Sequence, residues 1–325
     1  MQAMVINQPG GPEQFVLRDI PTPVPEKGEV LIRVKAFGIN RAELYMRKGT
    51  WFPPISPVTG IECVGQVEYD PSGSLAPGQT VAAIMGGMGR DRTGSYAEYT
   101  CVLLSNVFRL ETNLSWEHLA AIPESYATAW SCLFGNIGIE AGNVLFVRGG
   151  TSALGQAAIN VAKQAGVTVL TSTRSESNVK FLETLGAAHV LIENGQLSKI
   201  ERERYPDGID GVLDLLGDST MMDSLQMVRK GGHVCMAGFL AGQEPVSFAW
   251  ATSLPYGVHL SAFASFSLGT KEFPLSDIPM QQIVDHVADG SYQARPAQIF
   301  PFEGIADAHR LMEANRANGK IVIVR

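Results

Sequence analysis

The segment Asn143–Arg174, NVLFVRGGTSALGQAAINVAKQAGVTVLTSTR, contains the pattern that decides the fold. It begins with Val144–Val147, a short run of β-forming residues that leads into a loop of small residues. Gln156–Ala165 follows and is apolar at helical spacing, and Val167–Thr171 is a second β-type run that ends near an arginine. A strand, a small-residue loop, a helix and a second strand in this order predict a dinucleotide-binding unit.

Small residues occupy the loop because a pyrophosphate has to lie almost against its backbone. Backbone N–H groups and the positive end of the helix dipole attract the anion there. Gly149, Gly150 and Gly155 provide the necessary clearance. The loop departs from the usual fingerprint at Ser152, where a glycine is commoner. A glycine-rich loop alone is a weak signal, so the prediction depends on the strand and the helix that flank it.

The second strand leads into Ser172, Thr173 and Arg174, about 20 residues past the loop, where such units read the adenosine ribose. Proteins selective for NAD usually present Asp or Glu there. A guanidinium instead matches a phosphate dianion in charge and geometry, so Arg174 predicts NADPH over NADH. Two observations oppose this prediction. Exposed loops often carry an arginine that binds no ligand, and Glu176 lies two residues further on.

The composition is that of a folded globular protein. Of 325 residues, 45% are hydrophobic and 18% are charged, and the length favours two domains. The formal net charge of -7 offers no basic surface for nucleic acid. No apolar run reaches the length of about 18 residues that spans a membrane, and the amino-terminal residues do not resemble a signal peptide. We therefore expect a cytoplasmic protein without nucleic-acid or membrane partners.

Cysteines and histidines are scattered along the chain. The four cysteines include no C-x-x-C pair, and no two of the six histidines stand four residues apart. Zinc-binding segments usually bring their ligands together through such spacings. The sequence therefore predicts no bound metal.

The pattern of predicted secondary structure changes once along the sequence, at about residue 123. Before this point short β-type runs are separated by Pro and Gly, and after it helical segments alternate with apolar strands, as in a parallel sheet covered by helices. Residues 304–315 predict a helix and 320–324 a strand that returns to the first domain. We therefore expect residues 1–123 and 267–325 to form one domain and 124–266 the other. The expected strands are Gln2–Asn7, Val16–Asp19, Glu29–Phe37, Glu62–Glu68, Thr80–Ile84, Val144–Val147, Val167–Thr171, His189–Ile192, Gly211–Leu215, His233–Ala237 and Val258–Ala264.

With these features assembled, the whole chain resembles the medium-chain dehydrogenase/reductase superfamily, and within it the zinc-independent, quinone oxidoreductase-like branch. The resemblance rests on seven short motifs in the right order, each common alone and specific as a series. It implies an α/β protein with a GroES-like β-rich catalytic domain and a doubly wound, parallel-sheet Rossmann domain that binds NADPH. The motifs are Gly38–Glu43, Pro57–Glu62, Gly94–Glu98, Thr128–Trp130, Gly149–Gly155, Asp210–Gly217 and Ala308–Lys320.

The zinc alcohol dehydrogenases of this superfamily differ from the chain at their metal positions. They have a cysteine where this chain has Asn40 and a histidine where it has Ile61. Catalytic zinc needs sulfur or imidazole ligands in a fixed array, which these two side chains do not supply. Their structural-zinc lobe, with four closely spaced cysteines, is replaced by the glycine-rich Gly86–Gly94. The resemblance therefore implies an enzyme without metal.

Without zinc as a Lewis acid, the easier reaction is reduction of an electron-poor acceptor. The resemblance implies hydride transfer from NADPH to a quinone or an α,β-unsaturated carbonyl. It places Asn40 beside the nicotinamide, where its amide could bond the ribose or the substrate oxygen. It places Tyr45 at the substrate pocket, where a phenol could donate to a developing oxyanion. Taken alone, Asn40 would be a turn residue and Tyr45 a packed aromatic. Trp51 and Phe52 could form an aromatic wall for the acceptor or belong to the core.

The resemblance also implies an oligomeric state and a set of cofactor contacts, for several of which a structural role is an alternative. Val258–Ala264 would be an exposed edge strand, through which family members commonly form homodimers. A zinc-free alcohol or aldehyde dehydrogenase and a non-catalytic NADPH-binding protein remain alternative hypotheses. The residues assigned to the cofactor are Thr128, Gly150, Thr151, Ser152, Ala153, Leu154, Ser172, Thr173, Arg174, Asn178, Gly217, Gly238, Phe239, Ser265, Phe266, Asn318 and Lys320.

Overall fold

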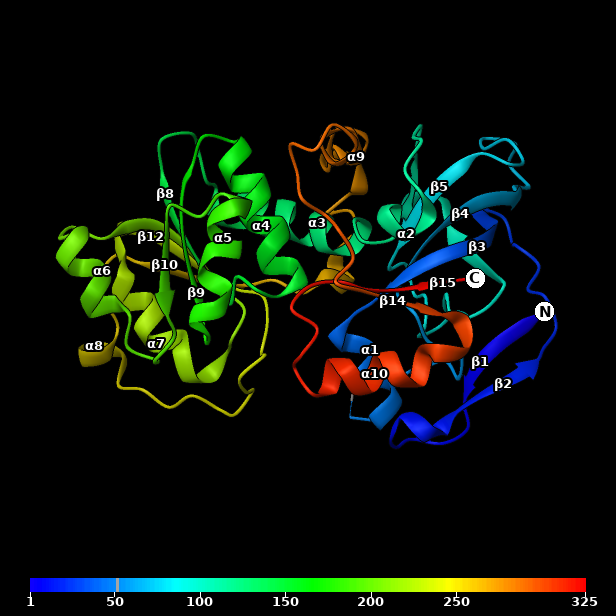
Figure 1. Cartoon of the computed structure of the whole chain (residues 1–325), viewed down its shortest axis with the longest axis horizontal. Coiled ribbons are helices and arrows are strands. Elements are labelled where there is room, and N and C mark those ends of the chain that lie inside the picture. The colour runs from blue at the N-terminus through cyan, green and yellow to red at the C-terminus, as the bar shows by residue number, and fades with distance from the viewer. Residues whose placement is uncertain (51–52) are drawn as a thin grey trace. The chain divides into compact units, whose positions relative to one another are not determined.

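The computed structural model describes residues 1–50 and 53–325, which form two compact units (Figure 1). The first unit comprises Met1–Ala127 and Ser265–Arg325, and the second comprises Thr128–Ala264. The boundaries expected after residues 123 and 266 lie a few residues from these positions. The aromatic wall proposed for Trp51 and Phe52 lies outside the described residues.

The second unit contains a six-stranded sheet in which all neighbouring strands are parallel. Its strands are β8 (Val144–Arg148), β9 (Thr168–Thr173), β10 (His189–Ile192), β11 (Ile209–Asp214), β12 (Val228–Met236) and β13 (His259–Ala262). Their spatial order is β10-β9-β8-β11-β12-β13, so the strand order reverses between β8 and β11. In doubly wound sheets, ligands bind outside the carboxyl ends of the strands at this switch point.

Helices cover this sheet and bury its apolar side chains. They are α4 (Ala153–Gln164), α5 (Val179–Leu185), α6 (Ser198–Arg204), α7 (Asp218–Met227) and α8 (Trp250–Ser253), with a π-helical turn at Ser131–Ile137. The helix α4 packs on β8 and β9, α5 packs on β10, and α7 packs on β11 and β12 (Figure 1). Phe146, Leu170, Val212 and Val234 from four adjacent strands form the core, as the apolar strand pattern predicts.

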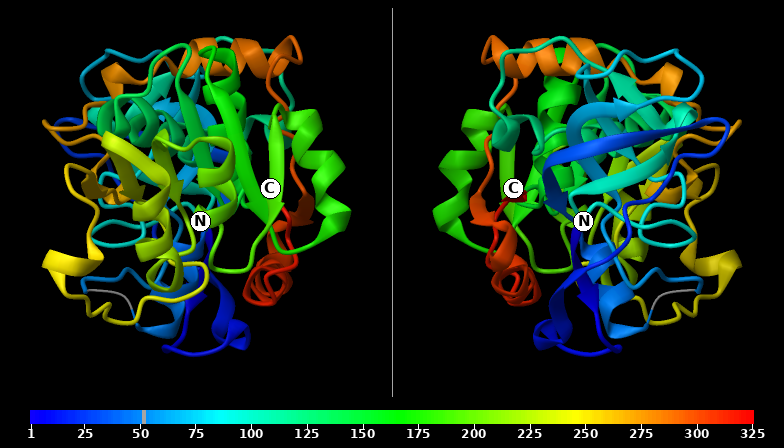
Figure 2. Two further views of the ribbon diagram at one scale, coloured as in Figure 1. Left: turned by 90° about the vertical axis from the view of Figure 1, so that its left-hand side faces the viewer. Right: turned by 90° about the vertical axis from the view of Figure 1, so that its right-hand side faces the viewer.

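The first unit is built mainly on antiparallel strands, and only the pair β14 and β15 is parallel among its described strands. Its strands are β1 (Gln2–Ile6), β2 (Phe15–Asp19), β3 (Glu29–Ile39), β4 (Glu62–Tyr69), β5 (Thr80–Ile84), β6 (Tyr99–Leu103), β7 (Val107–Arg109), β14 (Gln298–Pro301) and β15 (Ile321–Val324). β1 and β2 form a separate two-stranded ribbon, drawn in blue (Figure 2). The others form a sheet in the order β14-β15-β3-β4-β5-β7, in which β6 also pairs with β3.

The last strand of the chain, β15, lies inside this sheet between β14 and β3. β15 pairs with the second half of β3, whereas β6 pairs with its first half. Ile321, Val322 and Ile323 are fully buried, so the apolar run of the tail is an interior strand. The helices of this unit are α1 (Arg41–Lys48), α2 (Trp116–Leu119), α9 (Met280–Ala288) and α10 (Ile305–Glu313), and α3 (Pro123–Trp130) crosses the boundary between the units.

The observed elements differ from the predicted ones in two informative ways. The strand expected at Val167–Thr171 extends to Thr173, because its end pairs with β10 through Ile192. Ser172 and Thr173 are therefore strand residues. The helix α1 was not predicted, although Asn40 and Glu43 form a capping box, which is a local signal for a helix start. None of the helices in the described part of the chain is long and apolar enough to span a membrane.

Candidate functional site

The loop between β8 and α4 has no room for side chains at its glycines. Gly149 has a φ of +93°, a left-handed conformation that favours glycine. A Cβ on Gly150 would lie 2.1 Å from Thr171 Oγ1, and one on Gly155 would lie 2.5 Å from the carbonyl oxygen of Gly149. The glycines therefore let the loop pack against β9 and against itself. They also keep side chains away from the amino end of α4, where an anion would bind.

Ser152 has a structural reason to replace a glycine. Its hydroxyl accepts a hydrogen bond from the N–H of Gly155 at 3.0 Å and donates one to the carbonyl oxygen of Gly149 at 2.9 Å. Ser152 is thus the N-cap of α4 and closes the loop at the same time. Thr151–Leu154 is partly exposed, and the first N–H groups of a helix have no acceptor within it.

The end of β9 presents one predicted cofactor residue to solvent and buries two others. Ser172 and Thr173 are 0% and 4% exposed, respectively. The Asn178 side chain donates to Thr173 Oγ1 at 3.3 Å and so braces the turn that follows the strand. Arg174 is exposed, and within the described part of the chain its guanidinium has no hydrogen-bond or ion-pair partner. Arg174 is therefore available to a ligand.

Two predicted glycines at the ends of β11 and β12 are required by contacts within the chain. A Cβ on Gly217, which has a φ of +109°, would lie 2.3 Å from the carbonyl oxygen of Gly242. One on Gly238 would lie 2.7 Å from the carbonyl oxygen of Leu215. The lack of side chains is thus explained without a cofactor. Phe239 follows Gly238 and is partly exposed.

The other predicted cofactor residues are distributed over both units. Thr128 is buried in α3. Ser265 and Phe266 lie in a 3-10 turn, and Phe266 is 54% exposed. Asn318 is exposed and has a φ of +48°, a conformation that asparagine tolerates better than most residues.

Asn40 is held by charged side chains on both sides of its amide. Lys320 Nζ lies 2.6 Å from Asn40 Oδ1, and Asn40 Nδ2 lies 2.9 Å from Glu62 Oε1. The backbone N–H of Asn40 donates to Glu43 Oε2 at 2.7 Å, and Nδ2 lies 3.5 Å from Glu43 Oε1. The Lys320 ammonium can only donate and the Glu62 carboxylate can only accept, so these two neighbours fix the orientation of the amide. Its hydrogens are committed to the two carboxyl groups, and its oxygen remains able to accept a further hydrogen bond.

Lys320 is an interior residue of the first unit. It is 5% exposed, and its ammonium lies 2.5 Å from Glu62 Oε1 and 3.3 Å from Ser125 Oγ in addition to Asn40. Burial by itself lowers the pKa of Lys320, but the charges of Glu62 and Glu124 outweigh it, so the pKa is raised. The predicted cofactor residue Lys320 is thus a charged group whose donors are matched by protein acceptors.

Glu43 is the second buried carboxyl group beside Asn40, and no role was predicted for it from the sequence. Burial, followed by the charge of Glu62, raises its pKa to about 8, although Lys320 acts in the opposite direction. Glu43 is therefore mainly protonated at neutral pH, whereas Glu62 pairs with Lys320. The cluster around Asn40 thus contains Lys320, paired with Glu62 at 2.5 Å and with Glu124 at 3.8 Å, and one neutral acid, Glu43.

The helix that carries Tyr45 is anchored from its buried side. Arg47 in α1 is fully buried, and its guanidinium donates to the carbonyl oxygen of Gly10 at 3.0 Å and contacts His309 Nδ1 at 3.2 Å. It also forms an ion pair with Glu313 of α10. Tyr45 itself is partly exposed. The anchored helix α1 thus carries the partly exposed Tyr45 five residues after its N-cap, Asn40.

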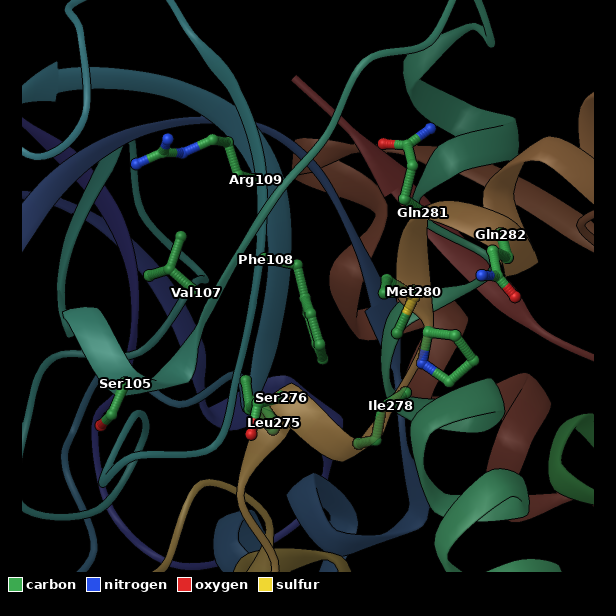
Figure 3. A pocket seen from close by; sticks show the side chains of 11 residues that line it. Ser105, Val107, Phe108, Arg109, Leu275, Ser276, Ile278, Met280, Gln281 and Gln282 are labelled. Carbon is green, nitrogen blue, oxygen red and sulfur yellow. The ribbon is translucent and has the colours of Figure 1, made fainter.

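A pocket of about 440 Å³ lies elsewhere in the first unit, between β7 and α9. Phe108, Ile278 and Met280 contribute its apolar lining (Figure 3). None of the predicted site residues lines it. Among residues 1–50 and 53–325, no three His, Cys, Asp or Glu side chains are grouped so that they could hold a metal ion.

Two family models match the chain. The alcohol dehydrogenase GroES-like domain matches residues 26–112, and zinc-binding dehydrogenase matches residues 185–323. The quinone oxidoreductase of Homo sapiens is 29% identical over 100% of this chain and 98% of its own length. The chain belongs to the medium-chain dehydrogenase/reductase superfamily, in its quinone oxidoreductase-like branch. The predicted family and fold class are thereby confirmed.

Solved structures of similar fold align with this medium-chain dehydrogenase/reductase over its whole length. Mycobacterial Rv1454c complexed with NADPH aligns with a TM-score of 0.88 and 23% identity over 100% of both chains. An NAD-dependent alcohol dehydrogenase aligns with a TM-score of 0.84 and 27% identity over 100% of both chains. The same fold therefore occurs with either nicotinamide dinucleotide. The choice between them depends on the residues of each chain.

Proposed function

We propose that this chain is an oxidoreductase that uses NADPH to reduce a quinone or an α,β-unsaturated carbonyl without zinc. The observation that carries the proposal is the position of Lys320. Its ammonium lies 2.6 Å from Asn40 Oδ1, beside the residue that replaces a zinc-ligand cysteine. A cation already occupies this place, and a zinc ion there would be repelled by it. The human quinone oxidoreductase, 29% identical, supports the acceptor class.

The residues of the second unit fit a bound NADPH. The amino end of α4 and the glycine loop suit the pyrophosphate, because their backbone is free of large side chains. The exposed guanidinium of Arg174 suits the 2′-phosphate. Mycobacterial Rv1454c, which has this fold, is complexed with NADPH. When bound, NADPH would supply the hydride, and the protein would bind, orient and shield it.

The hydrogen bonds of the Asn40 amide favour a role as an acceptor over a role as a donor. Both of its amide hydrogens face carboxyl groups, so it has no donor left for a developing oxyanion. We propose that its oxygen accepts a hydrogen bond from a ribose hydroxyl of the cofactor. Lys320 would be a positioning residue that keeps this oxygen in place. Tyr45 would donate a hydrogen bond to the acceptor oxygen as negative charge develops on it.

One assay tests the proposed activity. NADPH oxidation is followed with a naphthoquinone, an α,β-unsaturated ketone and a simple aldehyde, while cofactor binding is measured by fluorescence. Turnover with the first two acceptors is expected. The 27% identical NAD-dependent alcohol dehydrogenase favours a second candidate, a zinc-free alcohol or aldehyde dehydrogenase, which would act on the aldehyde instead. Binding without turnover on any acceptor would indicate a non-catalytic protein.

Two further measurements test the site and the absence of zinc. Tyr45→Phe should lower turnover with a good acceptor, whereas the control Tyr69→Phe on the exposed side of β4 should not. Unchanged turnover would make Tyr45 a packing residue. Elemental analysis of chelator-washed, active protein should find no stoichiometric zinc. One zinc per chain would contradict the proposal.

We also propose a homodimer in the cytoplasm. β13 is an edge strand of the second sheet, and Leu260 on it is 45% exposed. An open strand edge of this kind can pair with that of a second copy. All four cysteines are free and buried, as suits a reducing compartment. Light scattering should give the mass of a dimer, and Leu260→Lys should shift it toward that of a monomer.

A further inference from the structure

Arg148 ends β8 at the switch point of the parallel sheet, and its side chain is completely buried. Its Nε and Nη2 atoms bind the two carboxylate oxygens of Glu193 at 3.0 and 2.7 Å. Its Nη1 atom lies 2.9 Å from the carboxylate of Asp223 and donates to Ser224 Oγ at 3.0 Å. One guanidinium thus connects the end of β8 to the residue after β10 and to α7. None of these side chains has a role that was predicted from the sequence.

Glu193 extends this connection to the end of β9. Its carboxylate accepts a hydrogen bond from Ser172 Oγ at 2.8 Å, and its backbone N–H donates to the carbonyl oxygen of Thr173 at 2.8 Å. The Ser172 hydroxyl also accepts a hydrogen bond from the N–H of Gly149 at 3.3 Å. The glycine loop and the end of β9 are therefore held by one buried network. Arg174 is the next residue after this fixed segment.

Three carboxyl groups lie close to the guanidinium of Arg148 in this network. Asp214 joins it by accepting a hydrogen bond from Ser224 Oγ at 2.6 Å, so three carboxyl groups surround one guanidinium. Burial by itself raises the pKa of Glu193, but the hydrogen bond and charge of Arg148 outweigh it, so the pKa is lowered. Glu193 is therefore ionised, and its carboxylate binds the hydroxyl of Ser172, two residues before Arg174. A satisfied buried network of this kind fixes geometry, because each of its groups is costly to leave unpaired.

We infer that the connection Arg148–Glu193–Ser172 sets the selectivity of the site for the 2′-phosphate of the cofactor. It fixes the end of β9, so that Arg174 is held where the phosphate binds. Arg148, Glu193 and Ser172 are positioning residues, and Arg174 makes the contact. The inference rests on the proposed use of NADPH and assigns the residues that determine this preference.

Ser172→Ala tests the inference with little change in charge. It removes the hydroxyl that links Glu193 to β9 and leaves the ion pair with Arg148 in place. Thr168→Ala is the matched control, because it deletes an exposed hydroxyl at the other end of the same strand. Calorimetry measures the affinities for 2′,5′-ADP and 5′-AMP, which report the phosphate preference without turnover. The ratio of the two affinities should fall about tenfold in Ser172→Ala and stay unchanged in the control.

Glu193→Gln separates positioning from simple electrostatics. Removing a nearby anion would by itself strengthen phosphate binding, so a falling ratio supports positioning and a rising ratio overturns it. Urea unfolding checks that each variant folds, and if Ser172→Ala does not fold, Glu193→Gln decides. A wild-type protein that prefers 2′,5′-ADP, with Ser172→Ala showing the same ratio, overturns this inference alone. A wild-type protein without that preference overturns the proposed use of NADPH as well.

Discussion

Replacing Glu43 with Gln should remove a large pH dependence from the stability of the first unit. Glu43 is fully buried, and burial together with the charge of Glu62 raises its pKa to about 8 from an ordinary 4.5. It accepts hydrogen bonds from the N–H groups of Asn40 at 2.7 Å and Ile61 at 3.3 Å. Glutamine has nearly the same shape and does not titrate. Its single carbonyl oxygen can keep only one of these two bonds, because Asn40 bonds Oε2 and Ile61 bonds Oε1, but that loss is the same at every pH.

The sign and size of the effect follow from linkage between folding and proton binding. The pKa of Glu43 is raised in the folded state, so its stabilising contribution is complete below pH 4.5 and is lost as the pH rises to about 8. Between these values the folded protein holds a proton that the unfolded chain has released. Each pH unit therefore costs about 1.4 kcal/mol, and the whole interval costs about 3 to 5 kcal/mol. Glu43→Gln avoids this loss.

Equilibrium unfolding in urea at several pH values between 4.5 and 8 measures the effect. The free energy of unfolding of Glu43→Gln, taken relative to the wild type at the same pH, should rise steadily across this interval. Glu272→Gln, which changes an exposed carboxyl group of the same unit, is the control and should follow the wild type. If the curves of Glu43→Gln and the wild type stay parallel, Glu43 does not hold a proton and the account of the cluster is wrong.

Three other substitutions test separate parts of the site. Arg174→Asp should raise the KM for NADPH at least about tenfold more than that for NADH, because it replaces the phosphate partner with a like charge; equal changes would contradict the assignment. Gly155→Ala should lower the free energy of unfolding by about 1 to 3 kcal/mol, since its Cβ would lie 2.5 Å from the Gly149 carbonyl oxygen. The control Gly135→Ala, whose Cβ meets nothing within 4 Å, should leave the stability unchanged. Equal stabilities of the two variants would refute the close packing of the loop. Lys320→Met should cost about 3 to 5 kcal/mol in urea unfolding, because it leaves Glu62 buried without its cation. A loss below about 1 kcal/mol, the size expected for an exposed pair, would contradict the buried ion pair.

The parts of the fold that local patterns encode could be predicted from the sequence. The strands β5 and β10 begin and end where the alternation of apolar runs and turn residues places them. The glycine loop was found because a bound pyrophosphate and a tight strand-to-helix turn both need small residues. Ser152 was identified as unusual, and its role as the cap of α4 became clear only from its two hydrogen bonds.

The charged clusters could not be predicted, because their members come together only in the folded chain. Lys320 lies 280 residues from Asn40 in the sequence, and Arg148 lies 45 residues from Glu193. A lone lysine or arginine in a sequence is usually an exposed residue. Neither its burial nor the carboxylate that neutralises it has a local pattern. The N-x-x-E spacing of Asn40 and Glu43 was the one local signal, and it indicates a helix start without indicating a buried acid.

The place of β15 next to β3 has a consequence for the order in which the chain folds during synthesis. β3 is complete once residue 39 has left the ribosome, but its second half gains its partner only when residues 321–324 emerge. All six strands of the parallel sheet are synthesised in between. The second unit can therefore fold first, while the second half of β3 still lacks its partner strand, β15. That interval exposes the nascent chain to aggregation, and chaperones would act on the first unit during it.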